Sequence, residues 1–269
     1  MSTTILQVSD PHLGASGGPE RAELGRRHWA AFAERVSADP PALVVVSGDI
    51  VVDDPDDEAD QAEAATAVAS LGVPTLVLPG NHDVGDHQLR RGLPADWHGK
   101  LVTAERVAAW EARWGPSFRS LQLGSWTIIG INAQVLGSGT PREAEQWDWL
   151  ERTALAAGDP RPKLVFLHES LGPRPEDTGN DSWLSVPTAP GHRLAALIRD
   201  ANVALVAAGH THKYLAWSGD GIAQVTAPSL AGPILVRPDM TAASGDPDAG
   251  WLDHTLHDDG TVRSVRRLV

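Results

Sequence analysis

The sequence predicts an α/β protein in which strands and helices alternate along the chain. Short apolar runs such as residues 42–47 and 203–208 are typical of strands covered on both faces. Segments of helical length separate these runs. Several runs end in loops that carry Asp, Asn or His. Because catalytic groups in α/β proteins collect at the carboxyl ends of strands, this recurrence predicts a functional site at one sheet edge.

The first third of the chain predicts three strands, each followed by a polar loop. Pro11 and Gly14 end the first strand, so Asp10 and His12 are expected on the same side of a tight turn. The acidic stretch 53–58 places negative charge at the positive end of a helix that runs to about Leu71. The strands are expected at 3–9, 42–47 and 73–78, and the other helix at 19–38.

The remaining elements follow from apolar runs and capping residues. Thr140, Pro141 and Glu143 mark a helix start, with Thr as N-cap, Pro in the first position and Glu reaching back. From 84 to 124 the pattern is weak. The other expected elements are helices near 103–114 and 191–201, strands at 126–132, 163–168 and 203–208, and a C-terminal hairpin with its turn at Asp259-Gly260.

Size and composition limit the kind of protein and the kind of site. The 269 residues show no internal repeat and no linker, so one domain over 1–269 is expected. There are no cysteines, so a transition metal must be bound by His, Asn and carboxylates. The N-terminus resembles no signal peptide and no apolar run reaches transmembrane length, so a cytoplasmic protein with no membrane partner is expected.

The formal net charge of −13 argues against sequence-independent nucleic-acid binding, which needs Lys and Arg to neutralise phosphates. A small anionic substrate stays possible, because bound cations reverse the sign of the charge locally.

The polar residues at the strand ends form one candidate site. Taken singly, each has a structural explanation: Asp10 could start a turn, Asp49 could cap a helix, and His168 could be a hydrogen-bonded core residue. Taken together they favour a metal site, because five of the 11 histidines fall at strand ends in the company of Asp or Asn. The candidates are Asp10, His12, Asp49, Asn81, His82, His168, His210 and His212.

These residues occur in five ordered motifs: Asp10-Pro-His12, Gly48-Asp49, Gly80-Asn-His82, His168 and Gly209-His-Thr-His212. In this order the sequence resembles the calcineurin-like metallophosphoesterase superfamily, whose motifs are D-x-H, G-D, G-N-H, a later H and G-H-x-H. The resemblance implies a four-layer α/β/β/α sandwich of two mixed sheets flanked by helices. It also implies two divalent or trivalent transition-metal ions at the strand ends, with Mn, Fe and Zn as candidates.

Carried over residue by residue, the resemblance assigns roles to the candidates. Asp49 would bridge the two metals, and His82 would lie beside the substrate phosphate without binding a metal. The first metal would be bound by Asp10, His12 and His212, and the second by Asn81, His168 and His210.

Elementary chemistry accounts for the same residue types. Two cations about 3.5–4 Å apart stabilise both the attacking and the leaving oxygen of an in-line displacement at phosphorus. The nucleophile would be a hydroxide that bridges the metals. His82, with an ordinary pKa near 6.5, is suited to protonate the leaving alkoxide as general acid. Asp53 or Asp83 could orient His82, although the family's Gly after the bridging Asp is absent from segment 48–55.

The motifs point to two substrate classes. The D-x-H and G-N-H-D segments look closest to the cyclic-nucleotide phosphodiesterase branch, which favours a small phosphodiester. Asn132-Ala-Gln134 and helix residues 143–147 look more like phosphatase members, so a phosphomonoesterase or protein phosphatase is the alternative. A nuclease is less favoured because no basic stripe with interleaved aromatics occurs. A non-catalytic scaffold is less favoured because all eight positions are filled.

Two long loops are expected to shape specificity. They are residues 85–99 and 169–190, with Trp183 and, more weakly, Trp97 as possible stacking surfaces.

Overall fold

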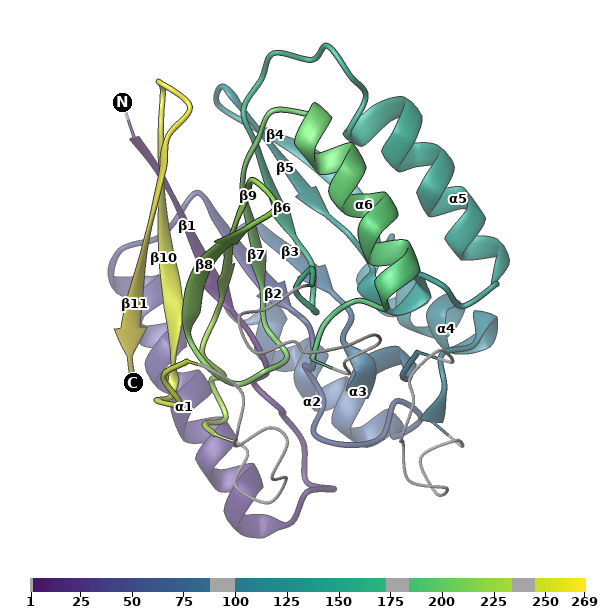
Figure 1. Ribbon diagram of the computed structural model, residues 1–269. Helices are drawn as coiled ribbons and strands as arrows, with labels where there is room; N and C mark the ends of the chain where they lie inside the picture. The colour runs from purple at the N-terminus through teal and green to yellow at the C-terminus, as the bar shows by residue number, and fades with distance from the viewer. Residues whose placement is uncertain (1, 88–99, 173–183, 234–244) are drawn as a thin grey trace.

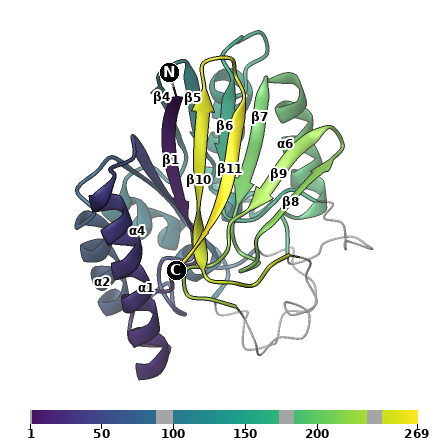
Figure 2. The ribbon, with the colours of Figure 1, turned by 90° about the vertical axis from the view of Figure 1, so that its left-hand side faces the viewer.

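The computed structural model describes residues 2–87, 100–172, 184–233 and 245–269. Two β-sheets pack face to face, and helices cover their outer faces (Figure 1). Figure 2 shows α1, α2 and α4 on one side of the sheets and α6 on the other. The four-layer α/β/β/α arrangement of two mixed sheets expected from the sequence is therefore confirmed.

The first sheet has five strands, of which β1, β2 and β3 run parallel while β10 and β11 run antiparallel to their neighbours. Their order is β11 (Val262–Leu268), β10 (Gly250–His257), β1 (Ser2–Val8), β2 (Leu43–Ser47) and β3 (Thr75–Leu78). The second sheet has a parallel centre with an antiparallel strand at each edge. Its order is β4 (Arg119–Leu123), β5 (Trp126–Gly130), β6 (Lys163–Phe166), β7 (Val203–Ala208), β9 (Ile222–Thr226) and β8 (Leu215–Gly219).

Helices from two parts of the chain cover the outer faces. The first sheet packs against α1 (Pro19–Ala38), α2 (Glu58–Ala69) and α4 (Ala104–Trp114). The second sheet packs against α5 (Pro141–Trp149), the π-helical turn Leu150–Ala154 and α6 (Thr188–Asp200). Short helical turns occur at α3 (Asn81–Val84) and η2 (Ala133–Val135).

The central strands β2, β5 and β6 are buried on both faces, as their apolar runs predicted. In β2, Val44 and Val46 join the core beneath the first set of helices, whereas Leu43 and Val45 face the second sheet. This alternation follows from the period of two in a strand. Because the central strands of each sheet are parallel, their carboxyl ends lie at one edge, and the loops that follow them meet there.

The hydrogen-bonded hairpin of β10 and β11 confirms the predicted C-terminal hairpin. Three strands and one short helix were not predicted: β4, β8, β9 and α3. None of the helices in the described ranges is long and apolar enough to cross a membrane.

Candidate active site

The loops that follow β1, β2, β3, β6 and β7 meet at one edge of the sandwich. The first two are joined by backbone hydrogen bonds, since Asp10 N donates to Gly48 O (3.0 Å) and His12 N donates to Asp49 O (3.2 Å). The loop after β7 joins them through His210 N, which donates to Asp10 Oδ2 (3.0 Å). Residues that lie 200 positions apart in the sequence are thus held within hydrogen-bond distance.

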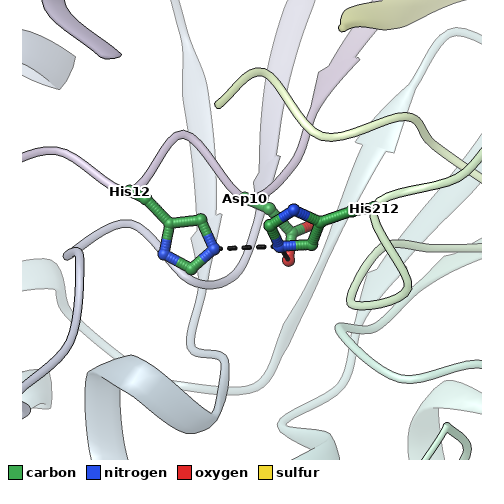
Figure 3. Close-up of side chains that lie close together, drawn as sticks. All are labelled: Asp10, His12 and His212. Atoms are coloured by element: carbon green, nitrogen blue, oxygen red, sulfur yellow. Dashed lines mark hydrogen bonds and ion pairs between the residues drawn. The ribbon is translucent and has the colours of Figure 1, made fainter. Parts of the chain in front are cut away.

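Asp10, His12 and His212 form one group of possible metal ligands (Figure 3). The Nε2 atoms of His12 and His212 lie 3.0 Å apart, and His212 Nε2 lies 3.4 Å from Asp10 Oδ1. Each ring places its Nδ1 near a backbone carbonyl, Val51 O at 3.1 Å for His12 and Gly232 O at 2.7 Å for His212. A donated Nδ1–H leaves the Nε2 lone pairs facing the carboxylate and each other.

This arrangement fits a cation. Two neutral imidazole lone pairs at this separation repel unless a positive charge lies between them. Asp10 Oδ1 is buried and has no hydrogen-bond partner in the described part of the molecule. A buried carboxylate oxygen without a donor is costly, and a metal ion would satisfy it.

Asp49, His168 and His210 form a second group of possible ligands, and Asn81 adjoins it. His168 Nε2 lies 3.3 Å from Asp49 Oδ2, 3.2 Å from Asn81 Oδ1 and 3.2 Å from His210 Nδ1. The Nδ1 of His168 is 2.8 Å from Ser47 O, which again turns Nε2 toward the carboxylate. The donors of this group are one imidazole pair, one carboxylate and one amide oxygen, a set that suits Mn, Fe or Zn.

His82 lies against both groups through Asp49 and His12. Asp49 Oδ1 accepts from His82 N (2.8 Å), and His82 Nε2 lies 3.8 Å from Asp49 Oδ2. The His82 ring meets the His12 ring edge-on, with centroids 4.9 Å apart. The His82 side chain is 18% exposed, whereas that of Asp49 is 3% exposed. His82 is therefore the candidate that solvent, or a substrate, can reach.

The backbone is strained where the candidates lie. Within the described ranges, seven residues other than glycine have a positive φ, and five of them are predicted ligands. Left-handed backbone is uncommon for such residues, and it persists where surrounding structure enforces it, often at functional sites. The five are Asp10 (51°), His12 (46°), Asp49 (50°), His210 (69°) and His212 (56°).

Three motif glycines allow the loops to approach closely. A Cβ on Gly48 would overlap the His168 ring, and one on Gly80 would overlap Asp49. A Cβ on Gly209 would overlap Ser9 Oγ. Packing between the loops therefore requires glycine at these three positions.

The electrostatics of the site favour the ionised forms of Asp10 and Asp49. Burial by itself raises the pKa of Asp10, but the neighbouring His212 outweighs burial and holds that pKa well below its usual range. Burial is likewise outweighed at Asp49, whose pKa His168 and His82 hold well below its usual range. Burial by itself lowers the pKa of His168, but the neighbouring Asp49 carboxylate outweighs burial and raises that pKa to about 10. For His12, burial followed by the charges of His212 and His82 lowers the pKa well below its usual range.

Neither carboxylate suggested as a partner for His82 lies beside it. The Asp53 side chain is 53% exposed and lies 3.3 Å from Lys100 Nζ. Asp83 is buried and accepts hydrogen bonds from backbone N–H groups of Gly80 (2.8 Å), Ile50 (2.9 Å) and Val51 (3.1 Å). Asp83 therefore braces the loops after β2 and β3. Among the described residues, the carboxylate nearest the His82 ring is Asp49.

The segment 229–232 supports the site and was not predicted. Ser229 Oγ (2.9 Å) and Ala231 N (3.1 Å) donate to Asp10 O, and Gly232 O accepts from His212. Apart from the Ser229 hydroxyl, these contacts use backbone atoms, which any sequence provides, so no motif marks the segment. Trp97 and Trp183 lie outside the described residues.

The chain is similar to two curated proteins of known activity. It is 29% identical over 274 residues to the 3',5'-cyclic adenosine monophosphate phosphodiesterase CpdA of Escherichia coli (strain K12), over 98% of this chain and 89% of that protein. It is 24% identical over 235 residues to the serine/threonine-protein phosphatase CPPED1 of Bos taurus, over 78% of this chain and 69% of that protein. One relative is thus a diesterase and the other a phosphatase.

Two solved structures share the fold. A dimetal phosphatase from Danio rerio has a TM-score of 0.62 at 10% identity over 98% of each chain. The purple acid phosphatase PPD1 from yellow lupin (Lupinus luteus) has a TM-score of 0.63 at 14% identity, over 99% of this chain and 52% of the lupin chain. The sequence model of the calcineurin-like phosphoesterases matches residues 3–214, which include all eight candidate residues. The chain is therefore a member of the calcineurin-like phosphoesterase family and a hydrolase of phosphoesters.

Proposed function

We propose that the chain hydrolyses a small phosphodiester, such as a cyclic nucleotide, with two transition-metal ions bound at the strand-end loops. The observation that carries this proposal is the approach of two imidazole Nε2 atoms, those of His12 and His212, to the partnerless Asp10 Oδ1. A second set of donors, His168 and His210, lies close to Asp49, which also lies close to His12. Asp10, His12 and His212 would bind one ion, and Asn81, His168 and His210 the other, with Asp49 shared between them.

When bound, the two ions would activate water and stabilise charge on the attacking and leaving oxygens of the phosphoryl group. The residues of the chain supply the remaining functions. With a cation bound, the Nδ1–H groups of His12, His168 and His212 would donate to backbone carbonyls, and each Nε2 would offer its lone pair to the cation. His82 would hold the proton that the leaving alkoxide takes up, because its ring is the most accessible of the cluster and borders both ligand groups.

The diester preference rests on the relative with the higher identity. That protein is a cyclic adenosine monophosphate phosphodiesterase that aligns over 98% of this chain. A small anionic substrate is compatible with the net charge of −13, because bound cations would make the potential positive at the site itself, where such a substrate would bind. A long polyanion would meet the acidic surface as well, which disfavours nucleic acid as a partner.

The test is an activity assay of metal-free protein reloaded with Mn, Fe or Zn one at a time. Three substrates separate the classes: cyclic AMP, bis-p-nitrophenyl phosphate and p-nitrophenyl phosphate. We expect metal-dependent hydrolysis, with kcat/KM for the two diesters above that for the monoester. Equal or higher kcat/KM for p-nitrophenyl phosphate would reject the diester preference, and absence of hydrolysis with every metal would reject the function.

A phosphomonoesterase or protein phosphatase is the second candidate. It is favoured by the similarity to a serine/threonine-protein phosphatase and by the Asn132-Ala-Gln134 segment after β5. A phosphoserine peptide in the same assay distinguishes this candidate, since a diesterase would leave it intact.

A further inference from the structure

A buried polar cluster lies directly beside the metal-ligand edge and has no role in the proposed chemistry. Glu169, the residue after the candidate ligand His168, is completely buried. Its Oε2 lies 3.0 Å from His87 Nε2, and its Oε1 accepts from Gln134 Nε2 at 2.8 Å. His87 is 1% exposed and Gln134 0% exposed. We refer to His87, Gln134 and Glu169 as the Glu169 cluster.

The cluster joins three separate stretches of the chain. His87 follows Asp86, which pairs with the stretch 100–102 through Asp86 N to Lys100 O and Val102 N to Asp86 O, both 2.8 Å. Glu169 precedes Ser170, which pairs with Ser185 and accepts from Val186 N at 3.0 Å.

Gln134 adds the turn after β5. Its backbone N donates to Asn132 Oδ1 (3.0 Å), and Asn132 N donates to Gln146 Oε1 of α5 (2.9 Å). A continuous line of buried side-chain hydrogen bonds thus runs from α5 to the connection between α3 and α4. It crosses the ends of β5 and β6, next to His168.

A gain in protein stability does not by itself explain why the polar side chains of the Glu169 cluster are buried. Burying a carboxylate is costly, and replacing buried ionic groups by apolar side chains of similar volume often leaves a protein as stable or more stable. What a hydrogen-bonded acid adds is a defined geometry, since each Glu169 oxygen has its own partner from a different segment. The other ring nitrogen of His87, Nδ1, is buried and has no hydrogen-bond partner in the described part of the chain, so Glu169 alone orients the ring.

We propose that His87, Gln134 and Glu169 are positioning residues that fix the paired stretches 86–87/100–102 and 169–171/184–186 at the metal-ligand edge and thereby set substrate affinity. The metal ligands have their own backbone partners, such as Ser47 O for His168 and Gly232 O for His212. Loosening the cluster should therefore displace the two paired stretches more than the metal ligands. This inference rests on the proposed phosphoesterase function.

The experiment compares two substitutions of one residue. His87→Leu removes the nitrogen that contacts Glu169 at nearly constant volume, whereas His87→Gln keeps an N–H donor that reaches the same oxygen. His254→Leu is the matched control, because His254 is also a fully buried histidine with polar contacts but lies in β10, outside the Glu169 cluster. Each variant is assayed for metal content, kcat and KM with bis-p-nitrophenyl phosphate and cyclic AMP.

We expect His87→Leu to retain two metals per chain and to raise KM by about tenfold or more, with kcat within about threefold, since small displacements distant from the chemistry cost up to 10²-fold. His87→Gln should restore most of the lost affinity, and His254→Leu should leave KM unchanged. Metal loss in His87→Leu, an unchanged KM, or the same KM increase in the His254 control would each overturn the inference.

A binding measurement separates this inference from the proposed function. Calorimetric affinity for bis-p-nitrophenyl phosphate is compared with and without His87→Leu in a His82→Ala background. Weaker binding with His87→Leu supports the inference even if the unmodified protein hydrolyses nothing, in which case the proposed function alone fails. If the unmodified protein hydrolyses substrate but the affinity is the same with and without His87→Leu, the inference fails and the proposed function stands.

Discussion

His12 Nε2 and His212 Nε2 lie 3.0 Å apart although 200 residues separate them in the sequence. Both rings are fixed from behind by a backbone carbonyl, and a buried carboxylate oxygen of Asp10 completes the group. A hydrophobic core has no use for this arrangement, since it buries two imidazole nitrogens and a carboxylate together.

Substitution of the proposed bridge should remove metal as well as activity. In Asp49→Asn the side chain loses the charge that two cations would share. We expect metal content below two per chain and metal affinity reduced by more than about tenfold, since even supporting residues cost 10–100-fold. Elemental analysis after dialysis measures the content. Full occupancy with near-normal kcat would remove Asp49 from the centre of the site.

Substitution of the proposed acid should separate binding from turnover. His82→Ala should keep both metals and slow turnover by about 10²–10⁴-fold, the usual contribution of a general acid. The loss should be smaller for bis-p-nitrophenyl phosphate than for cyclic AMP, because p-nitrophenolate leaves readily without a proton. Loss of metal in this variant would make His82 a ligand rather than an acid.

Close packing of the loops makes Gly209 sensitive to a single methyl group. In Gly209→Ala the new Cβ meets Ser9 Oγ and lies 2.7 Å from Asp10 Oδ2, so one loop must move. We expect the free energy of unfolding to fall by about 1–3 kcal/mol, as in other overpacked sites, and metal affinity to fall with it.

Gly25→Ala is the control for that substitution. Its Cβ would meet only Pro11 O and His12 O at 3.4–3.5 Å, within a helix that favours alanine by up to about 1 kcal/mol. Urea denaturation followed by tryptophan fluorescence compares the two variants. Equal stability of the two would show that the Gly209 loop has room for a side chain.

The positions of the strand ends could be predicted from the sequence, but the contacts that hold the strand-end loops in place could not. Apolar runs of β-branched residues located β1, β2, β3, β5, β6 and β7, and with them the polar loops that contain all eight candidates. The edge strands β4 and β8 were not predicted because only every second residue in them is partly buried. In β4 these residues are Arg119, Leu121 and Leu123. Their short alternation is hard to distinguish from a polar loop.

The contacts that hold the candidates in place are of kinds a single sequence does not reveal. The segment 229–232 supports Asp10 and His212 mainly through backbone atoms. His87 and Glu169 stand 82 residues apart and belong to none of the five motifs. Such pairs depend on the register of distant loops, which follows from the fold rather than from local spacing.

Protein stability should decline in mild acid because of His254. Burial lowers the pKa of this histidine from 6.5 to about 3, and its ring lies between Ser264 Oγ (2.7 Å) and Gln7 Oε1 (3.0 Å). The unfolded chain takes up a proton near pH 6.5, whereas the folded chain does not until about pH 3. The contribution of His254 is therefore complete above pH 6.5 and is lost progressively as the pH falls toward 3.

The variant His254→Gln isolates this contribution from that of other groups. At about 1.36 kcal/mol per pH unit, the difference in unfolding free energy between the unmodified protein and the variant should shrink by about 2 kcal/mol from pH 6.5 to 5. Urea denaturation at four pH values measures it. A difference that stays constant would mean that His254 takes up its proton at the same pH in the folded and the unfolded protein.

Substitution of Asp83 should lower protein stability and metal affinity, whereas substitution of Asp53 should lower neither. Asp83 is 2% exposed and accepts from the backbone of Gly80, Ile50 and Val51 with both carboxylate oxygens. In Asp83→Asn one oxygen becomes an NH₂ group that faces a backbone donor. We expect the unfolding free energy to fall by about 1–3 kcal/mol, because a buried donor loses its acceptor. Metal affinity should fall with it, since Asp49 and Asn81 lie in the two loops that Asp83 joins.

Asp53→Asn is the matched control, because the Asp53 side chain is 53% exposed and its ion pair with Lys100 lies at the surface. Stability, metal content and kcat of this variant should stay close to those of the unmodified protein. If instead Asp53→Asn lowered kcat as strongly as His82→Ala does, and Asp83→Asn left stability unchanged, Asp53 would be the residue that orients the acid. The measured pair of variants thus decides between a carboxylate that braces two loops and one that acts on the acid.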